Sequence, residues 1–272
     1  MGASNANFGQ FVTQGFTKPI RLIARLDVKG ENLIKGIQFE GLRVIGPPND
    51  KARFYYEQGV DELLYMDAVA SLYNRNHLAE LVTEVVRDVF IPITVGGGIR
   101  GVADVRELLR AGADKVAINT AAVKRPALLT DVAESFGSQC VMLSIEAKKT
   151  GTDSWEVYVD GGREKTGKDV MQWIPEAVAL GAGEVLITSV DRDGTERGFD
   201  YELMRRASEI SKVPVIASGG MGSSDHAADL LKNSEIDAVA VGRALHYDRL
   251  EIPQVRSDLH SQGIGVRAYG LV

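Results

Sequence analysis

The stretch ADKVAIN (residues 113–119) returns in the second half of the chain as IDAVAVG (residues 236–242). Two consecutive glycines, Gly96-Gly97, return as Gly219-Gly220. Both pairs of partners are 123 residues apart. A constant offset between matching strings indicates that one half of the chain duplicates the other.

Short apolar runs alternate along the chain with amphipathic helical stretches, and none of the runs is long enough for a helix. They are RLIARLDV (21–28), ELLYMDAV (62–69), PITVGG (92–97), KVAIN (115–119), VMLSIEA (141–147), EVLITSV (184–190), PVIASGG (214–220) and AVAVGRAL (238–245). Continuously apolar strands indicate a parallel sheet that is covered on both faces. A duplicated four-strand half closes most naturally into a (β/α)8 TIM barrel.

The length of 272 residues and an apolar fraction of 44% fit one domain of this kind. We expect a single (β/α)8 barrel over residues 17–272, preceded by an N-terminal extension, residues 1–16, without an assigned role. Two longer irregular segments, roughly 29–50 and 148–168, follow the first and fifth predicted strands. They are predicted to lie on one rim of the barrel as mobile loops.

A formal charge of −6 without a dense Lys/Arg run makes nucleic acid an unexpected partner. No stretch approaches the ~20 apolar residues of a membrane span, and the N-terminus does not resemble a secretory signal. Cys140 is the only cysteine, so an internal disulfide is excluded, as is typical of a reducing compartment. We expect a cytoplasmic protein.

Two carboxylates, Asp27 and Glu146, end the first and fifth apolar runs. These strands lie opposite each other in an eight-strand ring, so a ligand across the mouth meets one carboxylate from each side. Such a pair suits general acid and base catalysis. The alternative is that each carboxylate caps its loop or pairs with Lys29 or Lys148.

Glycines follow the third and seventh strands, and the ends of the fourth and eighth strands come 23 residues later, at Asn119-Thr120 and Gly242-Arg243. Glycine allows backbone N–H groups to approach an anion closely, and the last two βα loops of such barrels commonly bind phosphate. The repeat therefore predicts a ligand with a phosphate at each end. The alternative is that the glycines only permit tight turns.

No cofactor or metal is expected. Gly96, Gly98 and Gly101 match a dinucleotide-binding spacing, but Asn119 stands where an acidic ribose partner is needed. The four histidines are scattered and lack the spacing of metal ligands.

A third set of charged residues opens four of the apolar runs, at the opposite end of the barrel: Arg21, Glu62, Lys115 and Glu184. Charge at such positions is costly unless it is paired. The four residues form either a ring of ion pairs or ordinary solvated strand starts.

The strings LDVKG, KGIQFEGLR, IPITVGGGIR, GADKVAINTAAV, GAGEVLITSVDRDGT and PVIASGGMG together resemble the cyclase subunit family of imidazole glycerol phosphate synthase, over about residues 20–247. The resemblance implies a lyase-type cyclase of histidine biosynthesis in a heterodimer with a class I glutaminase. Ammonia from the glutaminase would pass through the barrel. It would convert a bis-phosphorylated ribulosyl formimino aminoimidazole carboxamide nucleotide into imidazole glycerol phosphate and the carboxamide nucleotide.

The resemblance also implies residue roles. Asp27 matches the catalytic aspartate, Glu146 occupies the position of the second catalytic residue, and the four charged strand starts match an ammonia gate. Lys35 matches a loop lysine that covers the substrate. The expected substrate or phosphate contacts are Lys35, Gly97, Gly98, Asn119, Thr120, Thr188, Asp193, Gly194, Ser218, Gly219, Gly220, Gly242 and Arg243.

Three positions depart from the family pattern. Glu146 stands in IEAK where the family has IDAK, Arg25 replaces a small residue on the inner face, and Arg243 replaces a small hydroxyl residue. Arg25 is predicted to pair inside the barrel with Glu146 or a gate glutamate. These departures leave two alternatives. One is a cyclase-like paralogue that delivers ammonia for sugar-nucleotide amidation in surface-polysaccharide synthesis, and the other is a catalytically weak subunit that docks the glutaminase and conducts ammonia.

Overall fold

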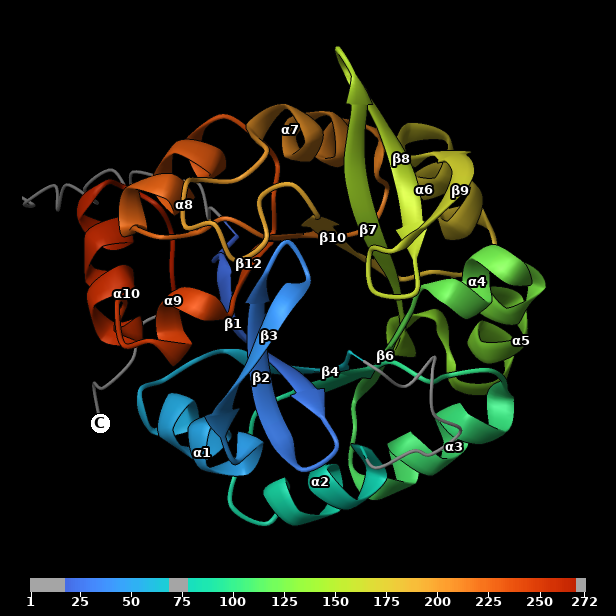
Figure 1. Ribbon diagram of the computed structural model, residues 1–272, viewed down its shortest axis with the longest axis horizontal. Coiled ribbons are helices and arrows are strands. Elements are labelled where there is room, and N and C mark those ends of the chain that lie inside the picture. The colour runs from blue at the N-terminus through green and yellow to red at the C-terminus, as the bar shows by residue number, and fades with distance from the viewer. Residues whose placement is uncertain (1–17, 69–77, 268–272) are drawn as a thin grey trace, which may run out of the picture.

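The computed structural model describes residues 18–68 and 78–267, so the predicted extension of residues 1–16 lies outside the described residues. All eight predicted apolar runs form strands. They are β1 (Arg21–Lys29), β4 (Glu62–Asp67), β5 (Ile93–Gly96), β6 (Lys115–Ile118), β7 (Val141–Gly151), β10 (Glu184–Ser189), β11 (Val215–Ser218) and β12 (Ala238–Val241). These strands pair in parallel in this order, and β12 pairs with β1 to close the ring (Figure 1). The predicted (β/α)8 barrel is confirmed.

Helices surround the ring of strands (Figure 1). They are α1 (Pro48–Glu57), α2 (Leu78–Val85), α3 (Val102–Ala111), α4 (Thr120–Lys124), α5 (Ala127–Phe136), α6 (Val170–Ala179), α7 (Tyr201–Ile210), α8 (Ser224–Lys232), α9 (Arg243–His246) and α10 (Ile252–Ser261), with a 3-10 turn at Ser138–Cys140. Side-chain caps start several of them: the Asp200 carboxylate, for example, accepts the Leu203 N–H at 3.2 Å. Within the described residues, no helix is long and apolar enough to cross a membrane.

The two segments predicted to be irregular are instead antiparallel hairpins. They contain β2 (Asn32–Ile37) and β3 (Glu40–Gly46) after β1, and β8 (Ser154–Val159) and β9 (Glu164–Asp169) after β7. In β8 buried and half-buried residues alternate, which is the period of a strand with one covered face. The β2–β3 hairpin lies across the centre of the ring in Figure 1, so it covers the mouth of the barrel.

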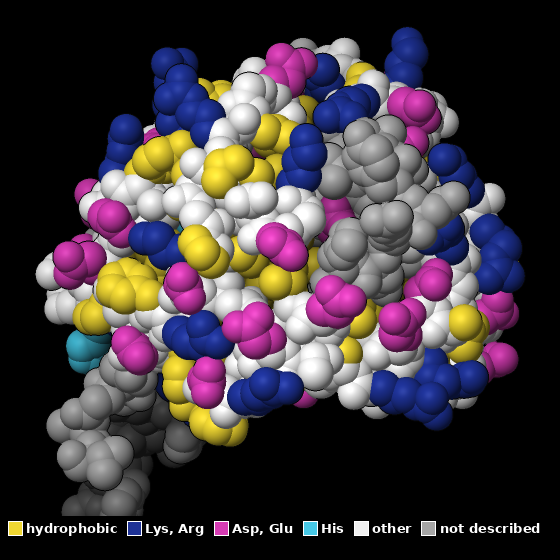
Figure 2. Space-filling model, turned by 60° about the horizontal axis from the view of Figure 1, so that its bottom comes forward, with side chains coloured by type: hydrophobic (Ala, Val, Ile, Leu, Met, Phe, Trp, Pro, Cys, Tyr) yellow, Lys and Arg dark blue, Asp and Glu magenta, His cyan; other side chains and the backbone are white. Residues whose placement is uncertain are grey.

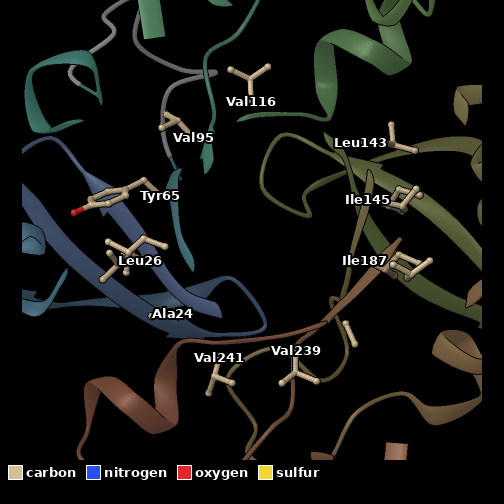
Figure 3. Close-up of a cluster of buried hydrophobic side chains, with 14 of the residues drawn as sticks. Ala24, Leu26, Tyr65, Val95, Val116, Leu143, Ile145, Ile187, Val239 and Val241 are labelled. Carbon is tan, nitrogen blue, oxygen red and sulfur yellow. The ribbon is translucent and has the colours of Figure 1, made fainter. Parts of the chain in front are cut away.

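Alternation along the strands separates an outer core from the barrel interior. The outer side chains, among them Leu26, Val95 and Ile187, belong to a large buried cluster with the helices (Figure 3). A smaller buried cluster fills the interior and includes Ile23, Leu64 and other apolar residues of the inner face. Arg21, Arg25 and Asp27 share the parity of Ile23, so β1 places three charged side chains on the inner face.

The duplication is also present in the backbone. Asn119 and Gly242, which are repeat partners, have nearly equal dihedral angles, with φ −117° and ψ −89° against φ −118° and ψ −81°. Gly97 and Gly220 have φ +100° and +104°, a region that favours glycine. The two halves therefore end their strands with the same local geometry at the mouth.

The outer surface carries charges of both signs. On the face shown in Figure 2, Lys/Arg and Asp/Glu side chains are interspersed and do not gather in a large patch of one sign. This face does not have the basic surface that a polyanion requires.

Candidate active site

A cavity of about 500 Å³ opens at the carboxyl ends of the barrel strands, and we call it the mouth cavity. Asp27, at the end of β1, and Glu146, near the end of the barrel part of β7, both line it. Phe39 and Leu42 of the β2–β3 hairpin form part of its wall. The fold therefore brings the two predicted carboxylates into one cavity at the end of the barrel where TIM-barrel active sites lie.

Asp27 is held between two buried cations. Its Oδ1 accepts from Arg25 Nε at 2.8 Å and its Oδ2 accepts from Lys35 Nζ at 2.5 Å. Burial raises the pKa of Asp27, but the charges of Arg25 and Lys35 outweigh burial and hold this pKa well below its usual range. Asp27 is therefore an anion at any physiological pH.

Lys35 was expected on a loop, but the structure places it on β2, where it is buried. Its Nζ also lies 3.1 Å from Asp193 Oδ1. Burial lowers the pKa of Lys35, but Asp193 and Asp27 outweigh this effect and raise the pKa. Lys35 thus bridges two carboxylates at the edge of the mouth cavity.

Arg25 lies inside the barrel, as predicted, but its predicted partner was wrong. The guanidinium pairs with Asp27, whereas Glu146 or a gate glutamate was expected. Its Nη1 donates to Thr188 Oγ1 at 2.7 Å and to Ser218 Oγ at 3.2 Å. Arg25 therefore reaches from β1 to β10 and β11 across the interior, because these hydroxyls and Asp27 are the partners that offset its burial.

Glu146 has a different environment from Asp27. Its Oε2 accepts the Gly162 N–H at 2.7 Å, from the turn between β8 and β9. Burial raises the pKa of Glu146 from 4.5 to about 7, although this N–H and the charge of Arg25 act to lower it. Glu146 can therefore release and take up a proton near neutral pH, which Asp27 cannot.

Ionisation of Glu146 is expected to destabilise the folded protein between pH 5 and pH 8. The unfolded chain loses this proton around pH 4.5 and the folded protein around pH 7, so stability falls as pH rises through this window. The expected loss is about 2.5 kcal/mol relative to Glu146→Gln. Urea unfolding of both proteins at pH 5 and pH 8 measures it, and parallel changes in the two proteins would contradict it.

The glycines after β5 face the mouth cavity. Gly97 and Gly98 line it together with Asn119 and Thr120, which are four of the expected contacts. A Cβ at Gly97 would lie 2.6 Å from the Asp67 carbonyl oxygen, so this position requires glycine. Asn119 Nδ2 donates to the Tyr158 carbonyl at 3.1 Å, and its Oδ1 is buried without a partner in the described residues. The cationic residues Arg100, Lys124, Arg125 and Arg163 also line this cavity.

The glycines after β11 face a much smaller cavity of about 20 Å³, which we call the β10–β12 cavity. Its lining contains the expected contacts Lys35, Asp193, Gly194, Ser218, Gly219, Gly220, Gly242 and Arg243. Thr188 and Ser218 already bond to Arg25, and Asp193 bonds to Lys35. Arg243 pairs with Glu196 at 2.9 Å. Many of the hydrogen-bonding and charged groups at this end are therefore already paired with other groups of the protein.

The four charged strand starts form a closed ring at the bottom of the barrel, which we call the bottom ring. Arg21 pairs with Glu62 and Glu184, each at 2.6 Å. Lys115 pairs with the same two glutamates at 2.9 and 2.7 Å. Of the two interpretations that the sequence left open, the ion-pair ring is the one observed.

Sequence reasoning missed several residues of the site. His246 is buried beside the site, and its Nδ1 lies 2.8 Å from the Tyr55 hydroxyl. Burial lowers the pKa of His246 to about 3, so its imidazole is neutral. Glu196 and Gly162 were also missed. Glu196 follows Asp193 by three residues in a loop already assigned to the site, so a full scan of that loop for charge was a usable signal.

Comparisons with known proteins identify close relatives. The model of one protein family, described as Histidine biosynthesis protein, matches residues 21–251. An imidazole glycerol phosphate synthase subunit HisF from Legionella pneumophila is 62% identical over 203 residues, which cover 75% of this chain and 96% of that protein. Proteins of the same name from Myxococcus xanthus (strain DK1622) and Streptococcus sanguinis (strain SK36) are 50% and 46% identical, and each alignment covers 91% of this chain and 98% of the relative.

Proposed function

The chain belongs to the histidine biosynthesis protein family, and from this membership we propose that it is the cyclase subunit of imidazole glycerol phosphate synthase. Its substrate is the bis-phosphorylated ribulosyl formimino aminoimidazole carboxamide nucleotide, and the nitrogen donor is ammonia. The products are imidazole glycerol phosphate and the carboxamide nucleotide.

The observation that carries the proposal is the unequal pair of carboxylates in the mouth cavity. Addition of ammonia to an electrophilic carbon builds positive charge on nitrogen and then requires the removal of a proton. Asp27, an anion between Arg25 and Lys35, stabilises that charge. Glu146, with a pKa of about 7, accepts the proton and returns it to a leaving group.

Two pairs of glycines, Gly97-Gly98 and Gly219-Gly220, support a ligand that extends across the mouth. We call these pairs the glycine cradles. Gly97 and Gly98 offer backbone N–H groups on one side, and Gly219 and Gly220 lie on the other. In this proposal each phosphate of the substrate is held at one cradle. The reacting carbon then lies between Asp27 and Glu146.

The relatives are named as subunits, and we propose that the partner here is a glutaminase that docks at the bottom of the barrel. Ammonia enters through the bottom ring and passes Arg25 to reach Asp27. The single thiol, Cys140, forms no internal disulfide, which suits the cytoplasm in which we place this reaction.

Lys115→Met is expected to separate the two sources of nitrogen. The change removes two of the four ion pairs of the bottom ring and does not alter any residue that lines the mouth cavity. Turnover driven by glutamine and the glutaminase should fall severalfold, while turnover driven by ammonium salt stays near the wild-type value. Lys232→Met on α8 is the control, because it removes an exposed lysine from elsewhere. Equal losses with both nitrogen sources would contradict a role in ammonia transfer.

The proposed activity is tested with purified protein, the bis-phosphate nucleotide and ammonium salt. Release of imidazole glycerol phosphate is expected, and no turnover above background would overturn the proposal. Growth of a histidine auxotroph that lacks its own cyclase subunit tests the same function in cells. Failure to restore growth would favour the sugar-nucleotide alternative.

A further inference from the structure

The two ends of the mouth are related by the duplication but differ in room and in charge. At the β5–β6 end the glycines line the mouth cavity of about 500 Å³, which also extends over Asp27, Glu146 and Asp193, and four cationic side chains line the same cavity. At the other end the glycines line the β10–β12 cavity, which is narrower, at about 20 Å³. The glycine pattern thus recurs in both halves, whereas the open space in front of the glycines differs.

An internal ion pair accounts for the difference. Glu196 Oε1 accepts from Arg243 Nε at 2.9 Å, and Glu196 Oε2 accepts from Arg249 Nη1 at 2.7 Å. Both Glu196 and Arg243 line the β10–β12 cavity. The Arg243 guanidinium also lies 4.8 Å from the centre of the Tyr247 ring. One cation in the lining of this cavity is therefore engaged by a carboxylate of the protein.

Glu196 is held firmly in this position. Its φ of +58° is unusual for a residue other than glycine, so the surrounding contacts must maintain it. A Cβ at Gly222 would lie 2.4 Å from the Glu196 carbonyl oxygen, which shows how closely the two backbones pack. Only 12% of the Glu196 side chain is exposed, so solvent screens its charge weakly.

A carboxylate at this place acts against a phosphate in two ways. Its negative charge repels the phosphate. It also accepts a hydrogen bond from the Arg243 guanidinium, which would otherwise donate to phosphate oxygens. At the β5–β6 end Asp160 is the comparable carboxylate, but its contact with Lys124 is longer, at 3.7 Å, and Lys124 is exposed. Asp160 therefore holds Lys124 less closely than Glu196 holds Arg243, and Arg125 at this end is paired with Asp131 at 2.9 Å.

We propose that Glu196 is a specificity-determining residue that weakens phosphate binding in the β10–β12 cavity, so that the protein holds phosphate more tightly at the β5–β6 end. The inference rests on the proposed function only in taking the two glycine cradles as the ends of the substrate site. The phosphate bound by the first half of the barrel is then the one held with the higher affinity.

The test is a titration of the full chain with inorganic phosphate, followed by ¹H–¹⁵N NMR. The amides of Gly97 and Gly98 report the β5–β6 end, and those of Gly219 and Gly220 report the β10–β12 cavity. In the wild type the first pair should saturate at the lower phosphate concentration. In Glu196→Gln the affinity at Gly219 and Gly220 should rise about tenfold, the size expected of one freed charge-assisted hydrogen bond.

A double-mutant cycle shows whether the gain passes through Arg243. Arg243→Gln alone should change phosphate affinity little, because its guanidinium is already engaged by Glu196. In the Glu196→Gln background the same change should remove the gain. Glu202→Gln on α7 is the matched control, since it alters the net charge equally at an exposed pair with Arg205.

Two results would overturn the inference while the proposed function stands. They are equal phosphate affinity at both ends of the wild type, and no gain at Gly219 and Gly220 in Glu196→Gln. Silence of all four amides in every variant would overturn the inference together with the proposed phosphate sites. Turnover of the wild type with the bis-phosphate nucleotide tests the proposed function separately, and in Glu196→Gln the KM for this nucleotide should fall.

Discussion

Asp27→Asn is expected to lower ammonium-driven turnover about 1000-fold. The asparagine keeps the size of the side chain and removes the negative charge that faces the mouth cavity. In the proposed reaction this charge stabilises the nitrogen that becomes positive during the attack of ammonia. The variant therefore loses a contribution made to the transition state, so kcat should fall far more than KM rises.

The same change also affects stability. Arg25 loses its ion-pair partner and keeps its hydrogen bonds to the hydroxyls of Thr188 and Ser218, while Lys35 keeps Asp193. Removal of one partner from a buried charged cluster typically costs about 3 kcal/mol. Urea unfolding should show a loss of this order, and turnover must be measured where the variant is fully folded.

Asp61→Asn is the matched control for this experiment. Asp61 is a buried carboxylate paired with Arg256 at 2.7 Å, and it accepts the Leu22 N–H at the bottom of the barrel. Its loss should destabilise the protein similarly but leave ammonium-driven turnover of the folded protein near the wild-type value. An Asp27→Asn variant that retained a tenth of the turnover would contradict the role given to Asp27.

Glu146→Gln is expected to lower kcat by about 100-fold to 1000-fold and to change its dependence on pH. Glu146 must be ionised to accept a proton, and its pKa is about 7. In the wild type, kcat should therefore rise with pH through 7 and level off above it. The glutamine variant should lack this step. Free ammonia must be held constant in the assay, because ammonia itself titrates.

Glu156→Gln is the control for the Glu146 prediction. Glu156 on β8 accepts the Gly167 N–H at 2.6 Å, as Glu146 on β7 accepts the Gly162 N–H, but Glu156 lies outside the mouth cavity. Its variant should keep both the rate and the step near pH 7. If Glu146→Gln also kept that step, another group would have to be the base.

Much of the fold was predictable because its signals are local. The apolar runs predict the barrel strands, and the repeated strings predict the order and symmetry in which these strands close. The hairpins were not predicted, because antiparallel pairing depends on partners across the turn and on the barrel rim beneath. Helices α1 and α10 each carry a proline in the first turn, a position that favours helix initiation.

The site divides along the same line. Its members, Asp27 and Glu146 among them, could be named from strand ends, because a strand end places a side chain at the mouth whatever surrounds it. The protonation states and the partners of these residues could not be predicted from the sequence. Arg25 obtains its partners from positions 188 and 218 as well as 27, and Asp27 obtains its second cation from β2.

The sequence by itself determined the barrel, its internal duplication, the family and the four charged strand starts. The tertiary structure decided that Asp27 is a fixed anion, that Glu146 titrates near neutral pH, and that Glu196 occupies Arg243 in one of two cradles. The physical reason is that burial and charge–charge distance set the state of an ionisable group. Both quantities arise only when residues far apart in the chain are packed together.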